Sequence, residues 1–494
     1  MSIIDSGLPI AAHRSRLHWR AALVAVLVTA WIAFATWHVV KPLPDGLAVG
    51  LPERATTMAE WIADDTWVDA NGKRRTDHAI FDRKLELIGQ AERLIVADQF
   101  LFNEFAGDAD GEDLRALAAE LTEALIARKL EVAELEVIFI TDPINTVYGS
   151  LVSPHLEAMR RVGIEVVITD LDRLRDSNPA WSGFWRVCCR WLGNSTANGW
   201  VPNPVGDEPI TLRSWLRLAN FKANHRKTLI VDHGDEWRGL VTSANPHDAS
   251  SAHSNQAVVF SGPAALDLLE SERAIVAFSR PEALWDRPGQ PESNAVRPSD
   301  VLVQVLTESA IRDGVIELLD STGDGDTVDL SMFYLSHRGI IEALKSAAGR
   351  GASVRALLDA NEHAFGRRKN GVPNRPVASE LTRDGIAVRW CHTTGEQCHD
   401  KQTLVRFADG RAELIAGTAN YTRRNLDDLN PETAVRLHGP DQAAALVAAT
   451  ERFDRRWHNR DGRSYSLDYS EYADDNRLRY WQYRVMEATG LSTF

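Results

Sequence analysis

Cysteine is scarce in this chain, which has four among its 494 residues, at Cys188, Cys189, Cys391 and Cys398. A chain of this length buries a large hydrophobic core by itself, so disulfide bonds are not needed to build its fold. Cys188 and Cys189 lie in an apolar stretch, and we expect them to be packed side chains.

An excess of positive charge is also lacking. The chain has 55 Lys and Arg residues against 69 Asp and Glu residues, for a formal net charge of -14. The first forty residues contribute three arginines and one aspartate, a net +2, so the remainder carries -16. Nucleic-acid binding needs a basic surface that neutralises phosphates. The composition therefore argues against a nucleic-acid partner, and we expect none.

Charged residues are absent from residues 21–40. Twenty residues at ~1.5 Å each span the roughly 30 Å hydrocarbon core of a bilayer. Arg14, Arg16 and Arg20 lie on the amino side of this run, whereas the charges that follow it are balanced. The positive-inside tendency then predicts a single-pass anchor in the inner (plasma) membrane, with the bulk of the chain on the extracytoplasmic side.

A cleaved secretory signal is the alternative, because Ala33, Phe34 and Ala35 form a small-x-small site. The anchor is favoured because the apolar run continues past that site and the amino tail is long. Both interpretations export the rest of the chain.

Two short stretches, about 170 residues apart, share one pattern. Each has a His and a Lys separated by one residue, then a short apolar alternation, then an Asn about twenty positions downstream. Side chains at i and i+2 of a strand share a face, so His and Lys are expected to point into one cleft. The members are His225, Lys227, Asp232, Ser243 and Asn245 in the first stretch, and His399, Lys401, Arg406, Thr418 and Asn420 in the second.

The chain around these stretches can be aligned as an internal repeat. Each half has three strand-like runs separated by helical stretches before its motif, and a strand ending in Gly-Pro followed by a helix after it. The runs are 94–102, 135–142 and 163–168 in the first half, and 328–334, 352–359 and 385–390 in the second. This alternation predicts an α/β fold with the order β-α-β-α-β-β-β-α, present twice.

The motifs resemble the signature of the phospholipase D superfamily, H-x-K-x4-D with a later G-S/T-x-N. The resemblance implies two tandem phospholipase D-like α-β-α lobes with pseudo-twofold symmetry, preceded by one transmembrane helix. The expected division is a cytoplasmic tail at 1–18, an anchor at 19–40, a linker at 41–78, lobe 1 at 79–280, an interlobe linker at 281–298, lobe 2 at 299–460 and a tail at 461–494.

Phosphodiester chemistry needs neutralisation of the phosphoryl oxygens, an in-line nucleophile and a proton for the leaving alkoxide. Two Lys and two Asn can hold the oxygens, while one imidazole attacks and the other donates the proton. The resemblance implies a phosphohistidine intermediate with no metal and no cofactor. The residues expected to act are His225, Lys227, Asn245, His399, Lys401 and Asn420.

Members of the superfamily place an acidic residue beyond each Asn, behind the His of the opposite half. Here the match is Glu432 in the second half, whereas alignment through the Gly-Pro marker puts Asn255 in the first. A carboxylate orients an imidazole and stabilises its positive form, while an amide only orients it. We therefore predict that Glu432 supports His225 as the nucleophile, and that His399, with Asn255, is the proton donor and later base.

The second motif departs from the superfamily pattern, since Arg406 stands where Asp is expected. Asp232, its counterpart, is predicted to be a structural support, so the site is expected to stay competent. A degenerate repeat with one competent half is the alternative. Ser243 and Thr418 either help to hold the phosphate or simply pack.

Between residue 168 and the first motif lies a long aromatic insertion. Tryptophan is favoured where apolar and aqueous regions meet, so the insertion is a candidate for contact with the bilayer surface. A lid packed over the sheet is the alternative. The aromatic residues are Trp181, Phe184, Trp185, Trp191, Trp200 and Trp215.

The pair Cys391 and Cys398 and the C-terminal tail each allow two interpretations. Cys391 and Cys398 flank the loop that leads into His399, and in an oxidising compartment they can pair. Together with His392 and His399 they also have the composition of a metal site, although Cys and His spacing alone is weak support for one. The tail around Tyr480 and Trp481 is either an amphipathic surface helix or a second membrane contact.

The anchor, the acidic charge and the aromatic insertion together resemble phospholipid-processing members of the superfamily, similar to cardiolipin synthases and bacterial phospholipases. We expect a phospholipid substrate and a membrane partner, with hydrolysis or phosphatidyl transfer as the reaction. An exported nuclease of the same superfamily and a catalytically silent lipid-binding or scaffold protein are the alternatives. The oligomeric state is left open, since the duplication supplies both halves of a site.

Overall fold

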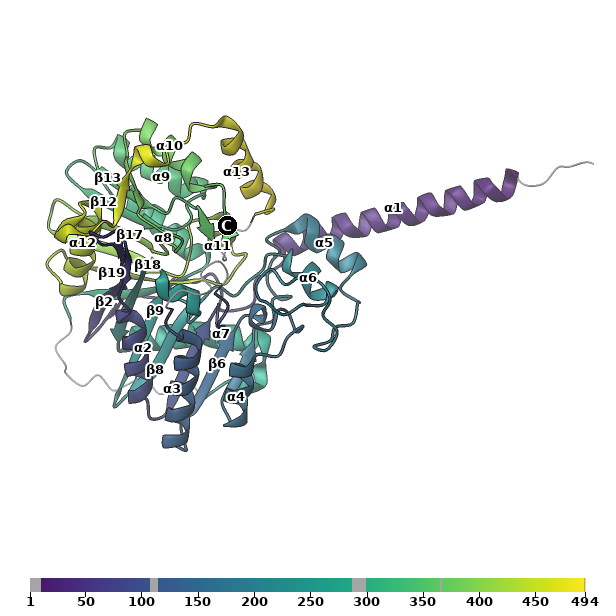
Figure 1. The fold of residues 1–494 in the computed structure, drawn as a ribbon, viewed down its shortest axis with the longest axis horizontal. Helices are drawn as coiled ribbons and strands as arrows, with labels where there is room; N and C mark the ends of the chain where they lie inside the picture. Colours follow the sequence, from purple (N-terminus) through teal and green to yellow (C-terminus); the bar gives the residue numbers. More distant parts are fainter. Residues whose placement is uncertain (1–9, 107–113, 287–298, 365–366, 493) are drawn as a thin grey trace, which may run out of the picture.

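The structure, a computed structural model, describes residues 10–106, 114–286, 299–364, 367–492 and 494. The first helix, α1 (Ile10–Val40), projects away from a two-lobed body (Figure 1). Within the described residues one segment, His18–Val40, is long and apolar enough to cross a membrane. None of its most apolar window is buried against the body, as expected for a helix that lipid surrounds. Residues 1–9 of the expected cytoplasmic tail and 287–298 of the expected interlobe linker lie outside the described residues.

Lobe 1 is built on a seven-stranded sheet with the order β2-β10-β9-β8-β5-β6-β7. Its three strands β5, β6 and β7 are parallel, and β8 joins them antiparallel through β5. The bounds are β2 Ala59–Asp64, β5 Leu94–Gln99, β6 Glu136–Thr141, β7 Glu165–Ile168, β8 Lys227–His233, β9 Glu236–Thr242 and β10 Asn255–Ser261.

Lobe 2 repeats this arrangement within a nine-stranded sheet, β1-β11-β19-β18-β17-β12-β13-β16-β20. Seven of its strands, from β11 to β16 in that order, match the lobe 1 sheet position by position, including the parallel run β12, β13 and β16. The bounds are β11 Leu302–Thr307, β12 Thr327–Met332, β13 Ser353–Leu358, β16 Ala387–Cys391, β17 Lys401–Arg406, β18 Arg411–Gly417 and β19 Thr433–Pro440, with edge strands β1 Arg54–Ala55 and β20 Ser466–Asp468.

Helices cover the outer faces of both sheets, and a third core lies between the lobes. In lobe 1, α2, α3 and α4 lie together on the outside (Figure 1), over a core of aliphatic side chains. In lobe 2, α8, α9 and α10 cover the corresponding core. Side chains from β strands of both lobes and from α7 and α12 share the central core, which fixes one lobe against the other. The bounds are α2 Ala79–Gln90, α3 Leu117–Glu131, α4 Pro154–Arg161, α7 Pro263–Ser279, α8 Ser309–Asp320, α9 Arg338–Gly349, α10 Asn374–Arg383 and α12 Ala444–Trp457.

The strand order differs from the sequence expectation in two respects. Four strands, not three, precede the last helix of each lobe: β7 to β10, with the helices of the insertion between β7 and β8, and β16 to β19, with the short α11 (Arg423–Leu426) between β18 and β19. Each lobe also has a strand that comes before its first parallel strand in the chain, β2 in lobe 1 and β11 in lobe 2. Residues 41–78, expected as a linker, contain β1 to β4. β1, β3 and β4 are hard to predict because they have only two or three residues, and β2 is hard to predict because only Trp61 and Asp64 of its six residues are buried.

The insertion after β7 packs on the membrane helix. Its helix α5 (Pro179–Cys188) lies along the inner end of α1, where Trp31 Nε1 donates to the carbonyl of Ala180 at 2.7 Å. Gly183 makes the close approach possible, since a Cβ there would lie 2.9 Å from Trp31. The insertion continues into α6 (Leu212–Leu218). Cys188 and Cys189, expected as packed thiols, are joined by a disulfide.

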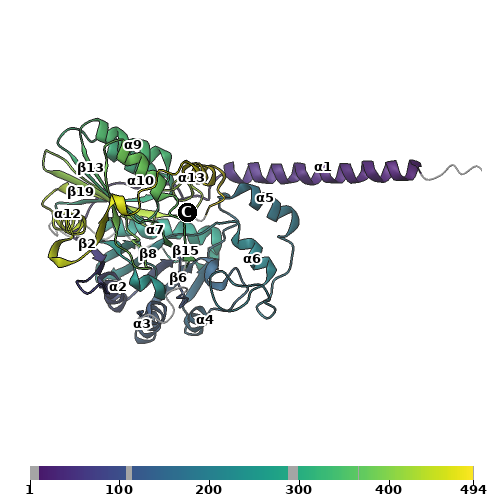
Figure 2. The ribbon, with the colours of Figure 1, turned by 45° about the horizontal axis from the view of Figure 1, so that its top comes forward.

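The C-terminal tail returns to the same end of the molecule. Its helix α13 (Arg477–Thr489) lies beside the inner end of α1 and near α5 in both views (Figures 1 and 2). Gly490, which ends α13, packs so closely on Ser177 that a Cβ would lie 1.7 Å from the Ser177 carbonyl oxygen. The insertion and the tail therefore form one surface around the base of the membrane helix.

Candidate active site

Both His-x-Lys motifs lie where the first parallel strand of each lobe ends. Lys227 opens β8 and pairs with Gln99, the last residue of β5. Lys401 opens β17 and pairs with Met332, the last residue of β12. The carboxyl ends of parallel strands are where α/β sheets bind ligands. The motifs thus occupy equivalent positions, one in each lobe.

His225 is held by lobe 2. Its Nδ1 lies 2.7 Å from Oε1 of Glu432, and its backbone N–H donates to the carbonyl of Pro431 at 3.0 Å. The ring lies against Phe100, with centroids 4.7 Å apart. Because a buried carboxylate fixes the Nδ1 side, Nε2 is left as the ring atom available to a ligand.

His399 is held by lobe 1 in the same way. Its Nδ1 lies 3.1 Å from Oδ1 of Asn255, and its backbone N–H donates to the carbonyl of Ser254 at 2.9 Å. The ring lies 5.2 Å from that of Phe333. Each histidine is therefore oriented across the lobe boundary, one by a carboxylate and the other by an amide.

The small hydroxyls of the motifs contact these supports. Ser243 donates to Oδ1 of Asn255 at 2.9 Å, and Thr418 donates to Oε2 of Glu432. The Ser243 hydroxyl also accepts the backbone N–H of Gln256 at 3.1 Å, and the Thr418 hydroxyl accepts that of Thr433 at 3.0 Å. Ser243 and Thr418 thus position the groups that orient the histidines, a role that the sequence did not suggest.

The two lysines are buried and lack acidic partners. Each donates to the backbone carbonyl of the histidine two residues earlier, at 2.7 Å for Lys227 and 2.8 Å for Lys401. Their ammonium groups lie 4.9 and 5.5 Å from the rings of Phe100 and Phe333. Among the described residues no carboxylate lies within ion-pair distance of either ammonium, so an anionic ligand would supply the missing charge.

The pKa values of these lysines reflect their burial. Burial lowers the pKa of Lys227 to about 7, with Glu432 and Asp98 acting in the opposite direction. Burial and the nearby charge of Lys227 hold the pKa of Lys401 well below its usual range. A phosphate placed between them would restore both positive charges.

Burial lowers the pKa of both imidazoles, which favours their neutral forms in the free protein. Burial lowers the pKa of His225 to about 4, against the opposing effect of Glu432. Burial and the charge of Lys401 hold the pKa of His399 well below its usual range, and Lys227 and His225 contribute further. The motif side chains of the two lobes are thus close enough to influence one another electrostatically.

The two asparagines differ in their contacts. Asn245 accepts the backbone N–H of Leu101 at 3.3 Å. Asn420 is also buried, and within the described part of the chain its Oδ1 has no hydrogen-bond partner. An unsatisfied buried amide is costly, and such groups gather where ligands bind.

Asp232 in lobe 1 and Arg406 in lobe 2 occupy equivalent positions, and both make structural contacts. Asp232 accepts the backbone N–H groups of Arg93 and Leu94 at 2.8 and 2.9 Å and so holds the start of β5. Arg406 instead pairs with Asp329 of β12 at 3.2 Å. The connection between the motif strand and the first parallel strand is therefore kept in lobe 2, with the signs of the charges exchanged.

The residues between His and Lys, Arg226 and Asp400, were missed as functional candidates. Strand alternation turns them away from the cleft. Arg226 pairs with Glu308 of lobe 2 at 2.9 Å, and Asp400 pairs with Arg452 of α12 at 3.1 Å. They anchor each motif to the lobe interface. The only sequence signal was a charged residue between His and Lys, immediately before each motif strand.

Cys391 and Cys398 form a disulfide next to His399. Their sulfur atoms are bonded to each other, so they are not the free thiolates that the Cys-His metal site considered from the sequence would use. No group of three or more His, Cys, Asp or Glu suited to a metal ion occurs among the described residues. His253, which the sequence did not single out, lies with its ring 6.0 Å from that of His399.

The comparisons with known proteins agree with this architecture. The family model described as "Cardiolipin synthase, PLD-like domain" matches residues 315–457, which include the second motif and Glu432. The chain is similar to phosphatidylserine synthase of Haemophilus influenzae Rd KW20, with 12% identity, 88% of this chain and 94% of that chain covered, and a TM-score of 0.51. Residues 315–457 therefore match the phospholipase D-like family, and the fold as a whole is shared with the phosphatidylserine synthase.

Two further solved structures are similar at lower TM-scores. Nuc of Salmonella typhimurium, a phospholipase D family member, is 22% identical, with 32% of this chain and 95% of that chain covered and a TM-score of 0.27. Polyphosphate kinase of Porphyromonas gingivalis is 14% identical, with 88% and 54% covered and a TM-score of 0.45. No curated protein matches the chain. The similarity to the phospholipase D superfamily rests on the family model over residues 315–457 and, for the fold, on the phosphatidylserine synthase.

Proposed function

We propose that this protein is a membrane-anchored phospholipase D-type enzyme that cleaves phospholipid phosphodiesters. One observation carries the proposal: His225 and His399, each supported from the opposite lobe, are buried together with Lys227 and Lys401, close enough across the lobe boundary to interact electrostatically. Two cations, two neutral imidazoles and an unsatisfied amide are the groups that phosphoryl transfer needs.

In the proposed first step Nε2 of neutral His225 attacks phosphorus, and the bond from phosphorus to the leaving alcohol oxygen breaks. His399 supplies the proton that this oxygen takes up. In the second step water or an alcohol attacks the phosphohistidine, its proton passes to His399, and the phosphorus–nitrogen bond breaks to restore His225. Glu432 supports the positive form of the modified imidazole, whereas Asn255 offers His399 no charge.

Proton donation by His399 requires its pKa to rise when substrate binds. In the free protein burial and Lys401 hold the pKa of His399 low. A bound phosphodiester places a negative charge beside the ring and raises that pKa. Protonation is then coupled to substrate binding, which limits the time the site spends with an idle imidazolium.

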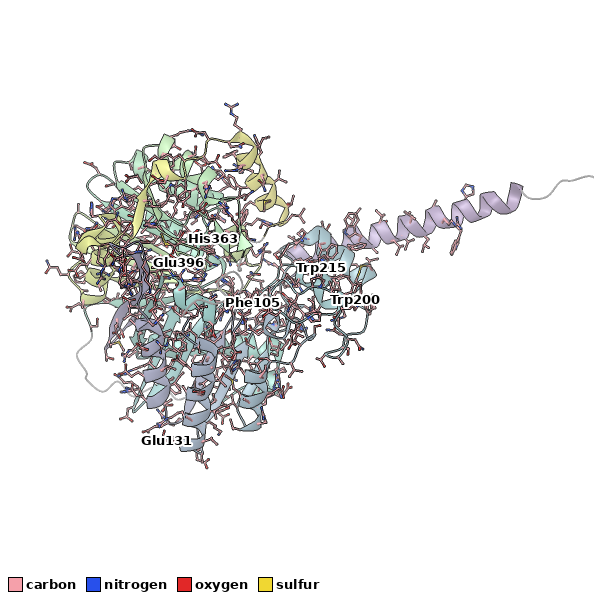
Figure 3. All side chains as sticks on the ribbon, viewed as in Figure 1. Phe105, Glu131, Trp200, Trp215, His363 and Glu396 are labelled. Carbon is pink, nitrogen blue, oxygen red and sulfur yellow. A yellow bond between two sulfur atoms is a disulfide. The ribbon has the colours of Figure 1, made fainter. Side chains whose placement is uncertain are left out.

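The surface around α1 supports a phospholipid substrate. Trp191 is 78% exposed, Trp200 71% and Trp481 62%, and Trp200 and Trp215 both lie on the insertion (Figure 3). On α13 the exposed apolar residues recur with helical spacing, at Leu478, Trp481 and Val485. Apolar side chains that surround the base of a membrane-spanning helix suit the interfacial layer of a bilayer.

Export of the lobes is part of the proposal. The arginines before the apolar run predict that α1 carries the lobes to the extracytoplasmic side. An alkaline phosphatase fusion after Pro44 tests this directly. Phosphatase activity is expected, and an inactive but stable fusion would place the lobes in the cytoplasm.

The reaction is tested by incubating the full-length protein with phosphatidylglycerol vesicles and, separately, with single-stranded DNA. Release of phosphatidic acid or a transphosphatidylated lipid, abolished by His225→Ala, is the expected result. Nucleotide release without lipid products would instead support the exported nuclease. Neither product, from a folded protein, would leave a lipid-binding or scaffold role.

A further inference from the structure

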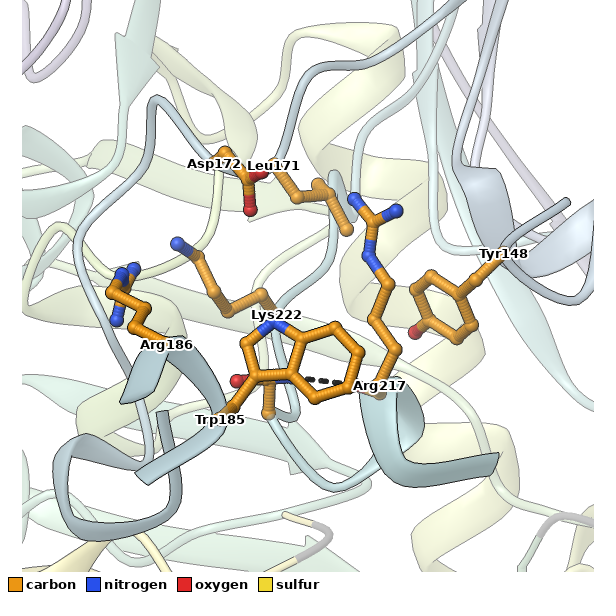
Figure 4. A pocket seen from close by; sticks show the side chains of 8 residues that line it. Tyr148, Leu171, Asp172, Trp185, Arg186, Arg217 and Lys222 are labelled. Carbon is orange, nitrogen blue, oxygen red and sulfur yellow. Dashed lines mark hydrogen bonds between the residues drawn. The ribbon is translucent and has the colours of Figure 1, made fainter. Parts of the chain in front are cut away.

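A second group of cations lies outside the catalytic cleft, in a small pocket between the insertion and the lobe 1 sheet (Figure 4). Arg186, Arg217 and Lys222 line it together with Trp185, Tyr148 and Asp172. Arg213 lies beside it, one helical turn before Arg217 on α6. The pocket carries a surplus of positive charge in a protein whose net charge is -14.

Two of these cations already have partners. Arg186 and Lys222 both pair with the buried carboxylate of Asp176, with Arg186 Nη2 2.9 Å and Lys222 Nζ 3.1 Å from Oδ1. Lys222 also donates to the carbonyl of Leu174 at 2.7 Å. These residues form the fixed wall of the pocket.

The other two cations, Arg217 and Arg213, form no ion pair among the described residues, although the carboxylate of Asp172 lies close enough to interact with both. The guanidinium of Arg217 lies 5.5 Å from the ring of Tyr148, and that of Arg213 lies 5.6 Å from the ring of Trp185. Within the described ranges neither makes a side-chain hydrogen bond or ion pair, and Nε of Arg213 is buried without a partner. Burial and the charge of Arg217 lower the pKa of Arg213. Arg213 and Arg217 lie one turn apart on α6 with each guanidinium against an aromatic ring, and guanidinium groups are favoured binders of phosphate.

The pocket is connected to the end of the membrane helix. Lys41, the residue after α1, donates from Nζ to the carbonyl of Asp172 at 2.7 Å, and Arg175 donates to the carbonyl of Lys41 at 2.9 Å. Burial and the charge of Lys222 lower the pKa of Lys41 to about 8. With α1 in the bilayer, the pocket therefore lies at the depth of the lipid phosphates.

The pocket is also close to the catalytic cleft. Lys222 precedes His225 by three residues, so their Cα atoms are at most about 11 Å apart. The segment between them is fixed, because the backbone N–H of Asn224 donates to Asp142 at 2.7 Å. A ligand in the pocket would therefore be a neighbour of the phosphodiester in the cleft, not the same group.

We propose that this pocket binds the phosphate of an anionic phospholipid other than the one being cleaved, through Arg213 and Arg217. This proposal rests on the proposed function in one respect, the presence of a cleaved lipid in the active site. The pocket and the guanidinium groups of Arg213 and Arg217 are present whichever reaction the protein catalyses. Binding there would hold the insertion on the leaflet and keep the mouth of the cleft against its lipid surface.

The test counts bound lipids by native mass spectrometry. Full-length protein carrying His225→Ala, which prevents turnover, is incubated with dihexanoyl-phosphatidylglycerol, and compared with the same protein carrying Arg213→Gln and Arg217→Gln. The matched control is Arg160→Gln, a surface arginine of α4. We expect two bound lipids in the parent and the control and one in the pocket variant, with at least a tenfold weaker affinity, about 1.4 kcal/mol, for the lost site.

Equal lipid counts in parent and pocket variant would overturn the proposal. One lipid in the parent and none in the pocket variant, together with no lipid turnover by the unmutated protein, would refute the proposed function and leave the pocket in place. Inorganic phosphate that binds the parent but not the pocket variant, while lipid binding is unchanged, would assign the pocket to free phosphate and overturn the lipid assignment. A further variant, Arg217→Lys, keeps the positive charge and should retain part of the lipid binding. Partial binding by this variant would show that the pocket variant loses its lipid through the lost charge and not through unfolding.

Discussion

The asymmetry between Glu432 and Asn255 leads to a quantitative prediction. Glu432 is fully buried and contacts Nδ1 of His225 at 2.7 Å. Glu432→Gln keeps the size of the side chain and removes its charge. A charge-assisted hydrogen bond of this kind contributes about 1.5–3 kcal/mol. At about 1.4 kcal/mol per tenfold change in rate, kcat should fall roughly 10- to 150-fold.

The assay is lipid turnover by full-length protein in phosphatidylglycerol vesicles, followed from pH 5 to 8. Asn255→Asp is the mirror-image variant, and it places a carboxylate behind His399. It should raise the pKa of His399 and move the alkaline limit of kcat/KM to higher pH. A Glu432→Gln enzyme within twofold of the unmutated rate, at every pH and with an unchanged melting temperature, would refute the assigned role of Glu432.

Three further predictions follow from the same contacts. The pKa of His225 is about 4 in the folded protein against about 6.5 in the unfolded protein. The unfolded state therefore binds more protons between these pH values, and the free energy of unfolding falls as the pH drops through that window. In denaturant titrations, His225→Gln should remove up to about 3 kcal/mol of this loss. Arg226→Met leaves Glu308 buried without its ion-pair partner at the lobe interface, and should destabilise the protein by about 3–5 kcal/mol in the same titrations, whereas Arg160→Gln on the surface should change little. Trp481→Ser on the exposed face of α13 should weaken vesicle binding of a fragment lacking α1, measured by co-sedimentation, while Tyr483→Phe, at a buried position of the same helix, should not.

The repeat was readable from the sequence because its strongest signals are local. Apolar runs such as 94–102 and 352–359 become the buried parallel strands β5 and β13, and His-x-Lys spacing follows from strand alternation alone. β2 is as long as β5, but only Trp61 and Asp64 of its six residues are buried, and its place in the sheet depends on its pairing with β10.

The supporting contacts of the site were harder to predict because they join residues far apart in the chain. Arg226 pairs with Glu308 across 82 positions, and nothing near either residue marks the other as its partner. Ser243 and Thr418 sit in the motifs, yet their hydroxyls turn toward Asn255 and Glu432 and hold the histidines indirectly. From the sequence, Arg406 removes the supporting carboxylate of the second motif. In the structure Asp329 on the neighbouring strand supplies a carboxylate that pairs with Arg406.

The most direct test is to trap the covalent intermediate on the full-length protein with a labelled phospholipid and map the modified residue by mass spectrometry. If His225 is the nucleophile and His399 the general acid and base, a phosphohistidine forms at position 225. It should accumulate in the His399→Ala protein and be absent from the His225→Ala protein. Label on His399 in the His225→Ala protein would contradict this assignment, and a folded, active protein that retains turnover without either histidine would refute the shared two-lobe site.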